Sequence, residues 1–275
     1  MTLKYVAKFT SPDGSTQSYT FPLAMYEWQV SQDVRNPIAP VVGADYGFRH
    51  LGRRPGSVGM MQHSIRCLAH SGDVDAEIAD AIATCRRIGE GKLWTLADDG
   101  TERWQWASLS NVPDFTISAV RPGLAPLVFE FVGRSEWFAD SETSVSETVT
   151  SQNQQWTVTN PGDLDVMGVT VRFKSNGSGG FTKPSILNQT NGHSITHDRT
   201  AADADSEVRI DTERHTAEWS TDAGGSYSDD IGNFEIGAEQ VAWMRIEPGN
   251  NTLSYSDDGT PNVDVEVSFH AAYAH

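Results

Sequence analysis

The chain of 275 residues is poor in the features that mark several functional classes. Lys and Arg number only 20 against 37 Asp and Glu, and the net charge of −17 argues against a protein that neutralises nucleic-acid phosphates. No apolar run approaches the roughly 20 residues of a membrane-spanning helix. Two cysteines are too few for a disulfide-rich scaffold. With 38% hydrophobic residues, the sequence indicates a globular, soluble protein of about two domains.

Signals for export, catalysis and cofactor binding are missing as well. The first residues, MTLKYVAKFTSPDG, lack the basic start and apolar run of a secretion signal, so we expect synthesis and folding in a cytoplasm. In that reducing setting we expect Cys67 and Cys85 as free, buried thiols, although their positions also allow them to meet. There is no Gly-rich phosphate loop, no Gly-x-Ser-x-Gly elbow and no cysteine with a motif-placed histidine. The sequence therefore predicts no enzyme, no catalytic residue and no cofactor.

Metal-binding patterns are weak. His193 and His197 lie four residues apart, a spacing that suits a zinc pair on a helix. The intervening Ile195-Thr196 favours a strand instead, in which residues at this spacing lie ~13 Å apart and cannot share an ion. Three Asp-rich pieces have the composition of hairpin turns and not the spacing of a calcium loop. We therefore expect no metal site.

One amphipathic helix is predicted at residues 73–89. Asp73 is placed to cap its first turn, and Gly89 is placed to end its last turn. The apolar residues recur at gaps of three and four, so they form a single stripe that faces a core. The stripe consists of Val74, Ile78, Ala81, Ile82, Cys85 and Ile88. A helix docked on a sheet is the predicted seed of the first domain.

Strands account for the rest of the first 140 residues. A hairpin is predicted where strands at 93–96 and 103–106 flank Asp99-Gly100, a dipeptide typical of tight turns. Val112-Pro113-Asp114-Phe115 is expected to interrupt the sheet. We expect His63 to be a packed, hydrogen-bonded residue rather than a ligand. Further strands are predicted at residues 3–10, 16–21, 25–30, 58–69 and 127–131.

A loop rich in Pro and Gly is predicted at residues 31–56. It carries Arg49, Arg53 and Arg54. A solvated basic loop is one interpretation of this cluster, and a contact surface for an acidic neighbour is the other. These three arginines are the candidate partner-contact residues of the sequence.

A polar, Ser/Thr-rich stretch at residues 139–153 follows Trp137-Phe138, an apolar pair that we expect to end the first domain. We place the boundary there, with domains at residues 1–140 and 141–275. The second half shows short strands separated by Asn-Gly and Asp-Gly turns, the pattern of an antiparallel sandwich. Its strands are predicted at residues 155–159, 166–174, 185–188, 207–211, 216–220, 233–236, 241–247, 252–256 and 263–270. The predicted fold class is therefore mainly β, with one helix in the first half.

The two halves differ strongly in charge. Residues 1–140 carry 13 Lys or Arg against 16 Asp or Glu, a net charge of −3, whereas residues 141–275 carry 7 against 21, a net charge of −14. A near-neutral half can pack against copies of itself, while an acidic half is best placed on an outer, solvated surface. Only five of the basic residues are Lys, a composition that suits concentrated salt, where repulsion is screened. A halophilic source is one hypothesis for this composition.

Several stretches resemble the distal tail proteins of long-tailed siphoviruses, the ring components of the tail tip. Residues 89–115 carry the resemblance, because the helix end, Gly-Lys-Leu-Trp, an Asp-Gly hairpin, Trp-x-Trp and Val-Pro-Asp-Phe follow in the family's order. It continues at residues 123–138, 208–212 and 245–253, and in a final strand at 263–273. The ordered set carries the match, since no single motif is diagnostic. Residues 31–56 and 175–205 have no counterpart in it.

The resemblance implies a ring-forming N-terminal domain, a split β-barrel with the helix at 73–89, and a peripheral C-terminal β-sandwich similar to galectins. It implies a structural virion protein, assembled in the host cytoplasm, of which six copies form a hub ring at the tail tip. Such a ring joins the tail tube protein to baseplate hub or tail fibre proteins. Viral DNA passes through the lumen without sequence recognition, and no membrane partner is implied.

The competing interpretation is a carbohydrate-binding module for host-surface glycans, because sandwiches of this shape bind sugars by stacking exposed aromatic rings. Trp156, Trp219 and Trp243 are available for this in the second half. Trp219 and Trp243 lie in alternating strands, so we expect them in the core. A third class, a tail-associated hydrolase, has no nucleophile or acid pair in the sequence to support it.

Overall fold

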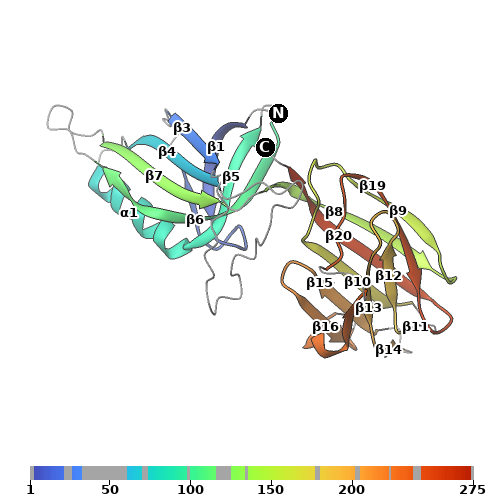
Figure 1. Ribbon diagram of the computed structural model, residues 1–275. Coiled ribbons are helices and arrows are strands. Elements are labelled where there is room, and N and C mark those ends of the chain that lie inside the picture. The colour runs from blue at the N-terminus through green and yellow to red at the C-terminus, as the bar shows by residue number, and fades with distance from the viewer. Residues whose placement is uncertain are drawn as a thin grey trace. The chain divides into compact units, whose positions relative to one another are not determined.

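The computed structural model describes residues 3–21, 27–32, 61–69, 74–97, 100–115, 125–133, 136–176, 180–201, 205–222, 224–237 and 243–273. The chain forms two compact units, unit 1 with Met1–Asp140 and Tyr273–His275, and unit 2 with Ser141–Ala272 (Figure 1). The sequence-based division differs at the end of the chain, where it assigns residues 273–275 to the second domain. The described residues form twenty strands, one α-helix and one 3-10 helix, which confirms the mainly β fold class. In these ranges no helix has the length and apolar character needed to cross a bilayer.

Unit 1 is built on one antiparallel sheet with the strand order β2-β1-β5-β6-β7-β4-β3. The strands are β1 (Leu3–Thr10), β2 (Ser18–Thr20), β3 (Glu27–Gln32), β4 (Met61–Ala69), β5 (Glu90–Ala97), β6 (Glu102–Phe115) and β7 (Ala125–Gly133). The start of β8 (Trp137–Val149) adds to β6, where Phe138 lies opposite Trp104. Among the described strands, β2 and β3 do not pair, so the sheet is not a closed barrel.

Helix α1 (Val74–Ile88) occupies the predicted stretch. Gly89 follows it with a φ of 66°, and its N–H donates to the carbonyl of Cys85 at 3.2 Å. This left-handed residue ends the helix as predicted. Arg86 and Arg87 lie in the last turn, near the negative end of the helix dipole. The predicted capping residue, Asp73, lies outside the described residues.

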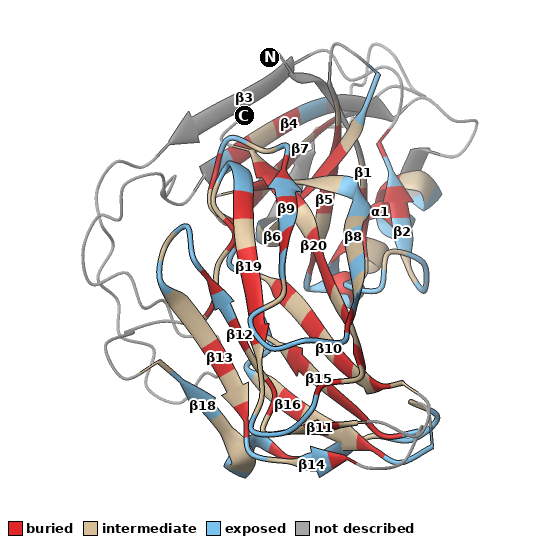
Figure 2. Ribbon diagram, turned by 90° about the vertical axis from the view of Figure 1, so that its right-hand side faces the viewer, coloured by how far each residue is buried: buried red, intermediate tan, exposed pale blue. Residues whose placement is uncertain are grey.

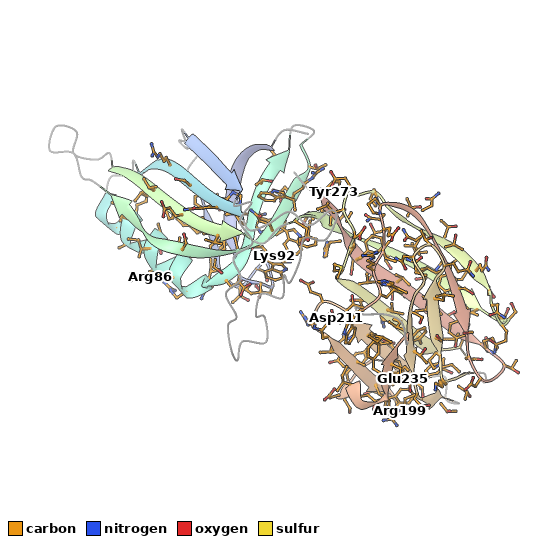
Figure 3. All side chains as sticks on the ribbon, viewed as in Figure 1. Arg86, Lys92, Arg199, Asp211, Glu235 and Tyr273 are labelled. Atoms are coloured by element: carbon orange, nitrogen blue, oxygen red, sulfur yellow. The ribbon has the colours of Figure 1, made fainter. Side chains whose placement is uncertain are left out.

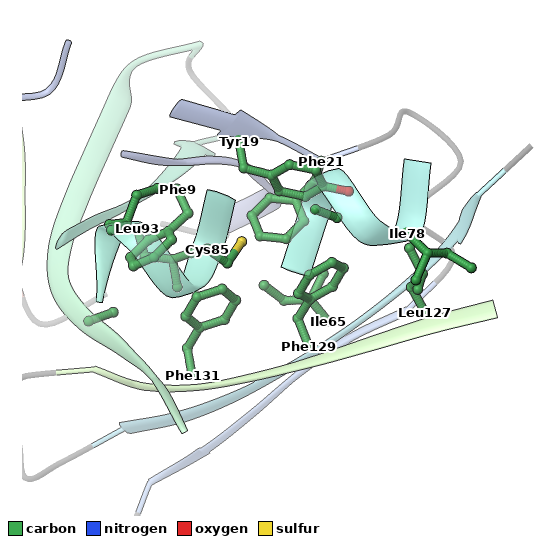
Figure 4. Packing of buried hydrophobic residues seen from close by; sticks show 13 residues of the cluster. Phe9, Tyr19, Phe21, Ile65, Ile78, Cys85, Leu93, Leu127, Phe129 and Phe131 are labelled. Atoms are coloured by element: carbon green, nitrogen blue, oxygen red, sulfur yellow. The ribbon is translucent and has the colours of Figure 1, made fainter. Parts of the chain in front are cut away.

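The apolar stripe of α1 packs on the inner face of the sheet (Figure 4). Four residues of the predicted stripe are buried there, Ile78, Ala81, Cys85 and Ile88. The sheet contributes aromatic rings, among them Phe9 and Phe131, whose centroids lie 4.8 Å apart. Cys85 is a free, buried thiol as predicted, while the side chain of Cys67 lies outside the described residues. The helix and the sheet therefore share one core.

A buried polar pair, His63 of β4 and Gln105 of β6, interrupts the apolar interior of unit 1. His63 has no exposed surface and is hydrogen-bonded to the amide of Gln105, which confirms the prediction of a packed, hydrogen-bonded histidine. Trp137 lies edge-on to the imidazole, with centroids 5.8 Å apart. Burial lowers the pKa of His63 to about 4 because the surroundings disfavour the imidazolium, and the bond to Gln105 opposes this shift. The imidazole is therefore neutral at pH 7.

Strand β6 is longer than the sequence indicates. The predicted interruption at 112–115 is wrong, because β6 continues to Phe115, which lies opposite Leu127 of β7. Register shifts occur between Leu109 and Asn111 and between Asn111 and Asp114. Such irregular pairing accommodates a proline within a strand, which is why Pro113 does not end it.

Unit 2 is a sandwich of two antiparallel sheets, with the strand orders β17-β16-β15-β10-β20-β8 and β18-β13-β12-β19-β9. The strands are β9 (Gln155–Asn160), β10 (Val169–Ser175), β12 (Ser185–Asn188), β13 (His193–His197), β15 (Glu207–Asp211), β16 (Thr216–Ser220), β17 (Ser228–Asp229), β18 (Phe234–Ile236), β19 (Gly249–Ser256) and β20 (Val263–Tyr273). A small pair, β11 (Phe181–Thr182) and β14 (Thr200–Ala201), and the 3-10 helix η1 (Ile231–Asn233) complete the unit. Buried residues alternate with more accessible ones along the longer strands (Figure 2), and inward rings such as Phe173 and Tyr255 meet between the sheets.

Two parts of this half differ from the prediction. The stretch at 139–153, for which no strand is predicted, continues β8 as far as Val149, and the division between the units falls within that strand. Residues 243–247 form no strand, and only Ile246 bridges to Val166. In the first half, Trp137, expected to end the first domain, begins β8 within the last residues of unit 1 and is buried. Because β8 consists largely of Ser, Thr and acidic residues, its sequence lacks the apolar alternation that indicates a strand.

Replacing Gly89 by alanine is expected to destabilise unit 1 by about 1 kcal/mol, because a left-handed φ is costly for any residue with a Cβ. A Cβ at Gly89 would meet nothing within 4 Å, so the cost is conformational alone. Gly91→Ala is the matched comparison, since its Cβ would lie 2.0 Å from the carbonyl oxygen of Thr10. Urea unfolding of both variants should show a clearly larger loss for Gly91→Ala, and equal losses would contradict this account.

The neutral His63 predicts that unit 1 loses stability in acid. Its pKa is 6.5 in its ordinary state and about 4 in the fold, so the unfolded chain binds the proton first as the pH falls. The contribution of His63 to the unfolding free energy is complete above pH 6.5. It decreases by up to about 1.4 kcal/mol per pH unit as the pH falls to about 4. His63→Gln should remove this part of the pH dependence of the unfolding free energy. His215→Gln, at an exposed histidine, is the control and should retain it.

Candidate interaction surfaces

The outer face of the unit 1 sheet, opposite the helix, carries a row of aromatic side chains. Lys8 lies opposite Trp94, and Trp94 lies opposite Trp104. Trp104 in turn lies opposite Phe138, so β1, β5, β6 and β8 each contribute one residue to the row. Their neighbours along the strands, such as Leu93, face the core. We call this surface the tryptophan face, and it consists of Trp94, Trp104, Trp106, Phe138, Lys8 and Lys92.

Ring stacking and cation–π contacts hold the tryptophan face together. Trp104 stacks on Phe138 with centroids 4.7 Å apart and planes 30° apart. The Nζ of Lys92, marked in Figure 3, lies 4.2 Å from the centroid of Trp104. The Nζ of Lys8 lies 4.4 Å from the centroid of Trp94. Trp94 and Trp104 are only 6% and 3% exposed, although they lie on the side of the sheet away from the core.

An antiparallel sheet usually has one apolar face and one solvated face, whereas this sheet is apolar on both. Trp106 and Phe138 are half-buried and so present ring surface at the margin of the tryptophan face. Lys92 adds positive charge to it, while the charge of Lys8 is paired with Glu102 at 3.2 Å. Aromatic residues with few acids are typical of the centre of a protein interface. The tryptophan face is therefore the candidate contact surface of unit 1.

The sequence alone did not reveal this surface, because it depends on the register of the β5–β6 hairpin. A two-residue turn at Asp99-Gly100 places Trp94 opposite Gln105, which puts Trp94 and Trp104 on opposite faces of the sheet. In the structure the last pair before the turn is Leu96 with Glu102, so the connection is longer. The spacing Trp-x-Trp places Trp104 and Trp106 on one face of β6, but only the register shows that Trp94 lies on the same face.

Unit 2 pairs nearly all of its few cations. Glu207 has no exposed surface and accepts two hydrogen bonds of 2.9 Å from Arg172 and one from the hydroxyl of Tyr227. The bonds to Glu207 raise the pKa of Arg172 above its ordinary value. Six of the seven basic residues of this half form ion pairs, namely Arg172, Lys183, Arg199, Arg209, Arg214 and Arg245. Because acids outnumber bases 21 to 7 there, the surface remains strongly negative.

Side chains from both sheets meet at one side of the sandwich in what we call the edge clamp, formed by Arg199, Asp230, Asn233 and His197. Arg199 donates two hydrogen bonds of 2.6 Å to Asp230, and Asn233 donates a third of 2.7 Å. The bonds from Arg199 lower the pKa of Asp230. The Nε2 of His197 lies 3.3 Å from Asp230, yet within the described chain neither ring nitrogen is hydrogen-bonded. Burial lowers the pKa of His197.

The predicted strand containing His193 and His197 is confirmed as β13. The two histidines do not converge on one site, since His193 contacts the carbonyl of Trp243 at 3.3 Å whereas His197 joins the edge clamp. Within the described ranges, no three side chains of the metal-binding types gather in one place. The candidate arginines Arg49, Arg53 and Arg54 lie outside the described residues, and their role as partner contacts stays a prediction.

The tryptophans of unit 2 are placed differently from the prediction. Trp156 is the buried one, at 9% exposure, while Trp219 and Trp243 are half-buried. Trp243 stacks on Phe234 with centroids 4.2 Å apart, and the guanidinium of Arg199 lies 5.5 Å from the ring of Trp219. The outer face of the sheet that contains β9 carries hydroxyl and amide side chains, including Thr157, Thr159, Ser185, Thr196, Asn250 and Thr252. The half-buried rings therefore lie near the edge clamp and not on this face.

Replacing Asp230 by asparagine is expected to destabilise unit 2 by about 2 kcal/mol, because it removes the charge that Arg199 and Asn233 donate to. Arg214→Gln is the matched control. Its pair with Asp211 spans 3.7 Å at a side chain 75% exposed, so its loss should stay within about 0.5 kcal/mol. Urea unfolding measures both. The lowered pKa of Asp230 makes its contribution complete above pH 3.8, so the Asp230→Asn effect should shrink below that pH.

The fold has counterparts among phage tail proteins, although no protein-family model and no curated protein matches the sequence. The chain is similar to the SPP1 Dit protein, a hub of the adsorption apparatus in phages that infect Gram-positive bacteria, with a TM-score of 0.57 and 11% identity over 90% of both chains. It is also similar to a chain of the phage p2 baseplate in its activated, calcium-containing conformation, with a TM-score of 0.50 and 9% identity over 98% of both chains. The chain therefore has the fold of a phage tail hub protein.

Proposed function

We propose that this chain is a structural protein of a long-tailed phage virion, a hub at the distal end of the tail. The observation that carries the proposal is the likeness to the SPP1 Dit protein, which extends over 90% of both chains and therefore includes both units. A likeness restricted to one of the two units would be weaker support, because sandwiches and sheets of this size occur in proteins of many functions. The surfaces of this chain support the finer parts of the proposal.

The hub is a ring of six copies in which unit 1 forms the ring and unit 2 lies outside it. Residues 1–140 carry a net charge of −3, so six copies can approach one another, whereas residues 141–275 carry −14 and repel at close range. A closed ring needs a heterologous contact between two different patches of unit 1. The tryptophan face, with the half-buried rings of Trp106 and Phe138 and with Lys92, supplies one of these patches.

The ring joins the tail tube protein on one side to baseplate hub or tail fibre proteins on the other, and viral DNA passes through its lumen without sequence recognition. Arg49, Arg53 and Arg54 contact an acidic neighbour in this arrangement. The protein is assembled in the host cytoplasm and resides at the tail tip of the virion. We infer a structural role rather than a catalytic one, because the buried titratable groups His63, Glu207 and Asp230 engage in internal pairs that stabilise the fold.

The purified chain is expected to form a ring of about six subunits at high salt, with a mass near six times 30.1 kDa. At low salt the ring should shift toward smaller species, because repulsion between copies of unit 2 is less screened. Size-exclusion chromatography with light scattering at both salt concentrations measures the mass. A strict monomer at every protein and salt concentration would overturn the proposed ring.

A pair of variants separates the tryptophan face from general effects on solubility. Trp106→Glu places a charge at the half-buried margin of that face and should reduce the ring to single subunits. Leu187→Glu, at a residue 37% exposed on unit 2, makes the same kind of change away from the ring and should leave the mass unchanged.

A further inference from the structure

The two sides of the unit 2 sandwich end in very different strands. On one side the sheets end in β17 and β18, which are two and three residues long. On the other side they end in β8 and β9, with nine residues of β8 within unit 2 and six in β9. Residues 150–154 join β8 to β9. The exposed residues along both strands are visible in Figure 2. The sandwich therefore has one short-edged side and one long-edged side.

The short-edged side carries charges that oppose strand addition. Arg199 and Asp230 of the edge clamp lie beside β17, and Lys183 pairs with Glu235 of β18 at 3.6 Å. Arg199 and Glu235 are marked at the same end of unit 2 in Figure 3. Short edge strands and charged side chains are the usual means by which proteins prevent another chain from pairing with a sheet.

The edge strand β9 has none of these protections. Its sequence, QWTVTN, contains no charge and no proline, and its burial alternates strictly. One backbone edge pairs with β19 without a register shift, from Gln155 opposite Ser254 to Asn160 opposite Gly249. Within the described chain, no strand pairs with the other edge. An unpaired row of N–H and C=O groups of this length is a template for an added strand.

A second observation falls on the same strand. The indole N–H of Trp156 is buried and lacks a hydrogen-bond acceptor among the described residues. A buried donor without an acceptor costs about 1–3 kcal/mol, so such groups are rare unless something else supplies the acceptor. Trp156 faces inward from an edge strand, a position at the rim between the two sheets.

The charges around β9 select the kind of chain that it accepts. Gln154, which precedes β9, donates to Glu147 of β8 at 2.8 Å, and Gln152 donates to Asp257. Glu142 is exposed near the start of the unit 2 part of β8, and Asp258 is exposed just after β19. A second copy of unit 2 would bring a further −14 to this acidic side, so it is disfavoured. A segment flanked by lysine or arginine is attracted.

We propose that β9 is a docking edge at which an extended segment of a partner protein, uncharged in the middle and basic at its ends, adds as a sixth strand of the sheet. Backbone hydrogen bonds to β9 provide the affinity, and acidic residues of β8 and of the turn after β19 provide the selectivity for basic flanks. This proposal concerns unit 2 and does not depend on the ring formed by unit 1.

The test uses the full chain and a synthetic peptide, KKTVTVTVKK, with EETVTVTVEE as the charge-reversed control. Hydrogen exchange followed by mass spectrometry should show a saturable slowing of amide exchange at residues 155–160 with the lysine peptide, and none with the glutamate peptide. The slowing should require more peptide as salt is raised, because the attraction is electrostatic. No slowing with the lysine peptide, equal slowing with both, or slowing centred on β17 and β18 would overturn the proposal.

Two variants identify the edge. Thr157→Pro removes a backbone donor from β9 and should abolish the slowing. Since that variant alters the strand itself, Glu142→Gln combined with Asp258→Asn provides a second measurement on exposed side chains. It should leave thermal stability unchanged and raise the apparent Kd of the lysine peptide several-fold. An unchanged Kd in this double variant would refute the charge selection.

Discussion

The register of the β5–β6 hairpin is the constraint on which the organisation of unit 1 depends. With Leu96 opposite Glu102, both Trp94 and Trp104 lie on the outer face, and Leu93 faces the helix. A slip of one residue would reverse every side chain of one strand and place a tryptophan in the core in exchange for a polar residue. The same pairing thus decides where α1 packs and where the tryptophan face is. Core and contact surface are two results of one set of backbone hydrogen bonds.

Unit 2 is organised by a different balance, between a conventional apolar interior and a surface with too few cations. The sheets bury alternate residues of their long strands, and the polar remainder holds buried carboxylates such as Glu207 and Asp230 only where an arginine meets them. Removing a partner from such a pair leaves a buried charge, which costs more than the pair itself contributes. The arginines therefore serve the interior of the fold first, and the short-edged side of the sandwich depends on one of them, Arg199.

Much of the fold could be predicted from local pattern. The helix, with Gly89 after it, and the strands β1, β12, β15 and β16 lie at the predicted bounds, because apolar periodicity and turn residues act over a few neighbours. The errors fall where longer-range pairing decides. Strand β8 is built from Ser and Thr and is held by its neighbours, β6 continues past Pro113 through a change of register, and the hairpin connection is longer than Asp99-Gly100 suggests. The tryptophan face and the free edge of β9 depend on the order of strands in the sheets. That order joins segments far apart in the chain, so no short sequence motif reveals it.

The matching of six of the seven cations in unit 2 has a consequence for the medium around the protein. The excess carboxylates have almost no internal counterpart, so mobile ions drawn from solution must accompany them, and these ions become a functional part of the folded surface. In an assembly with several such units, this ion cloud would set how closely the outer parts can crowd. The ionic composition of the surrounding solution then helps to determine how this surface behaves.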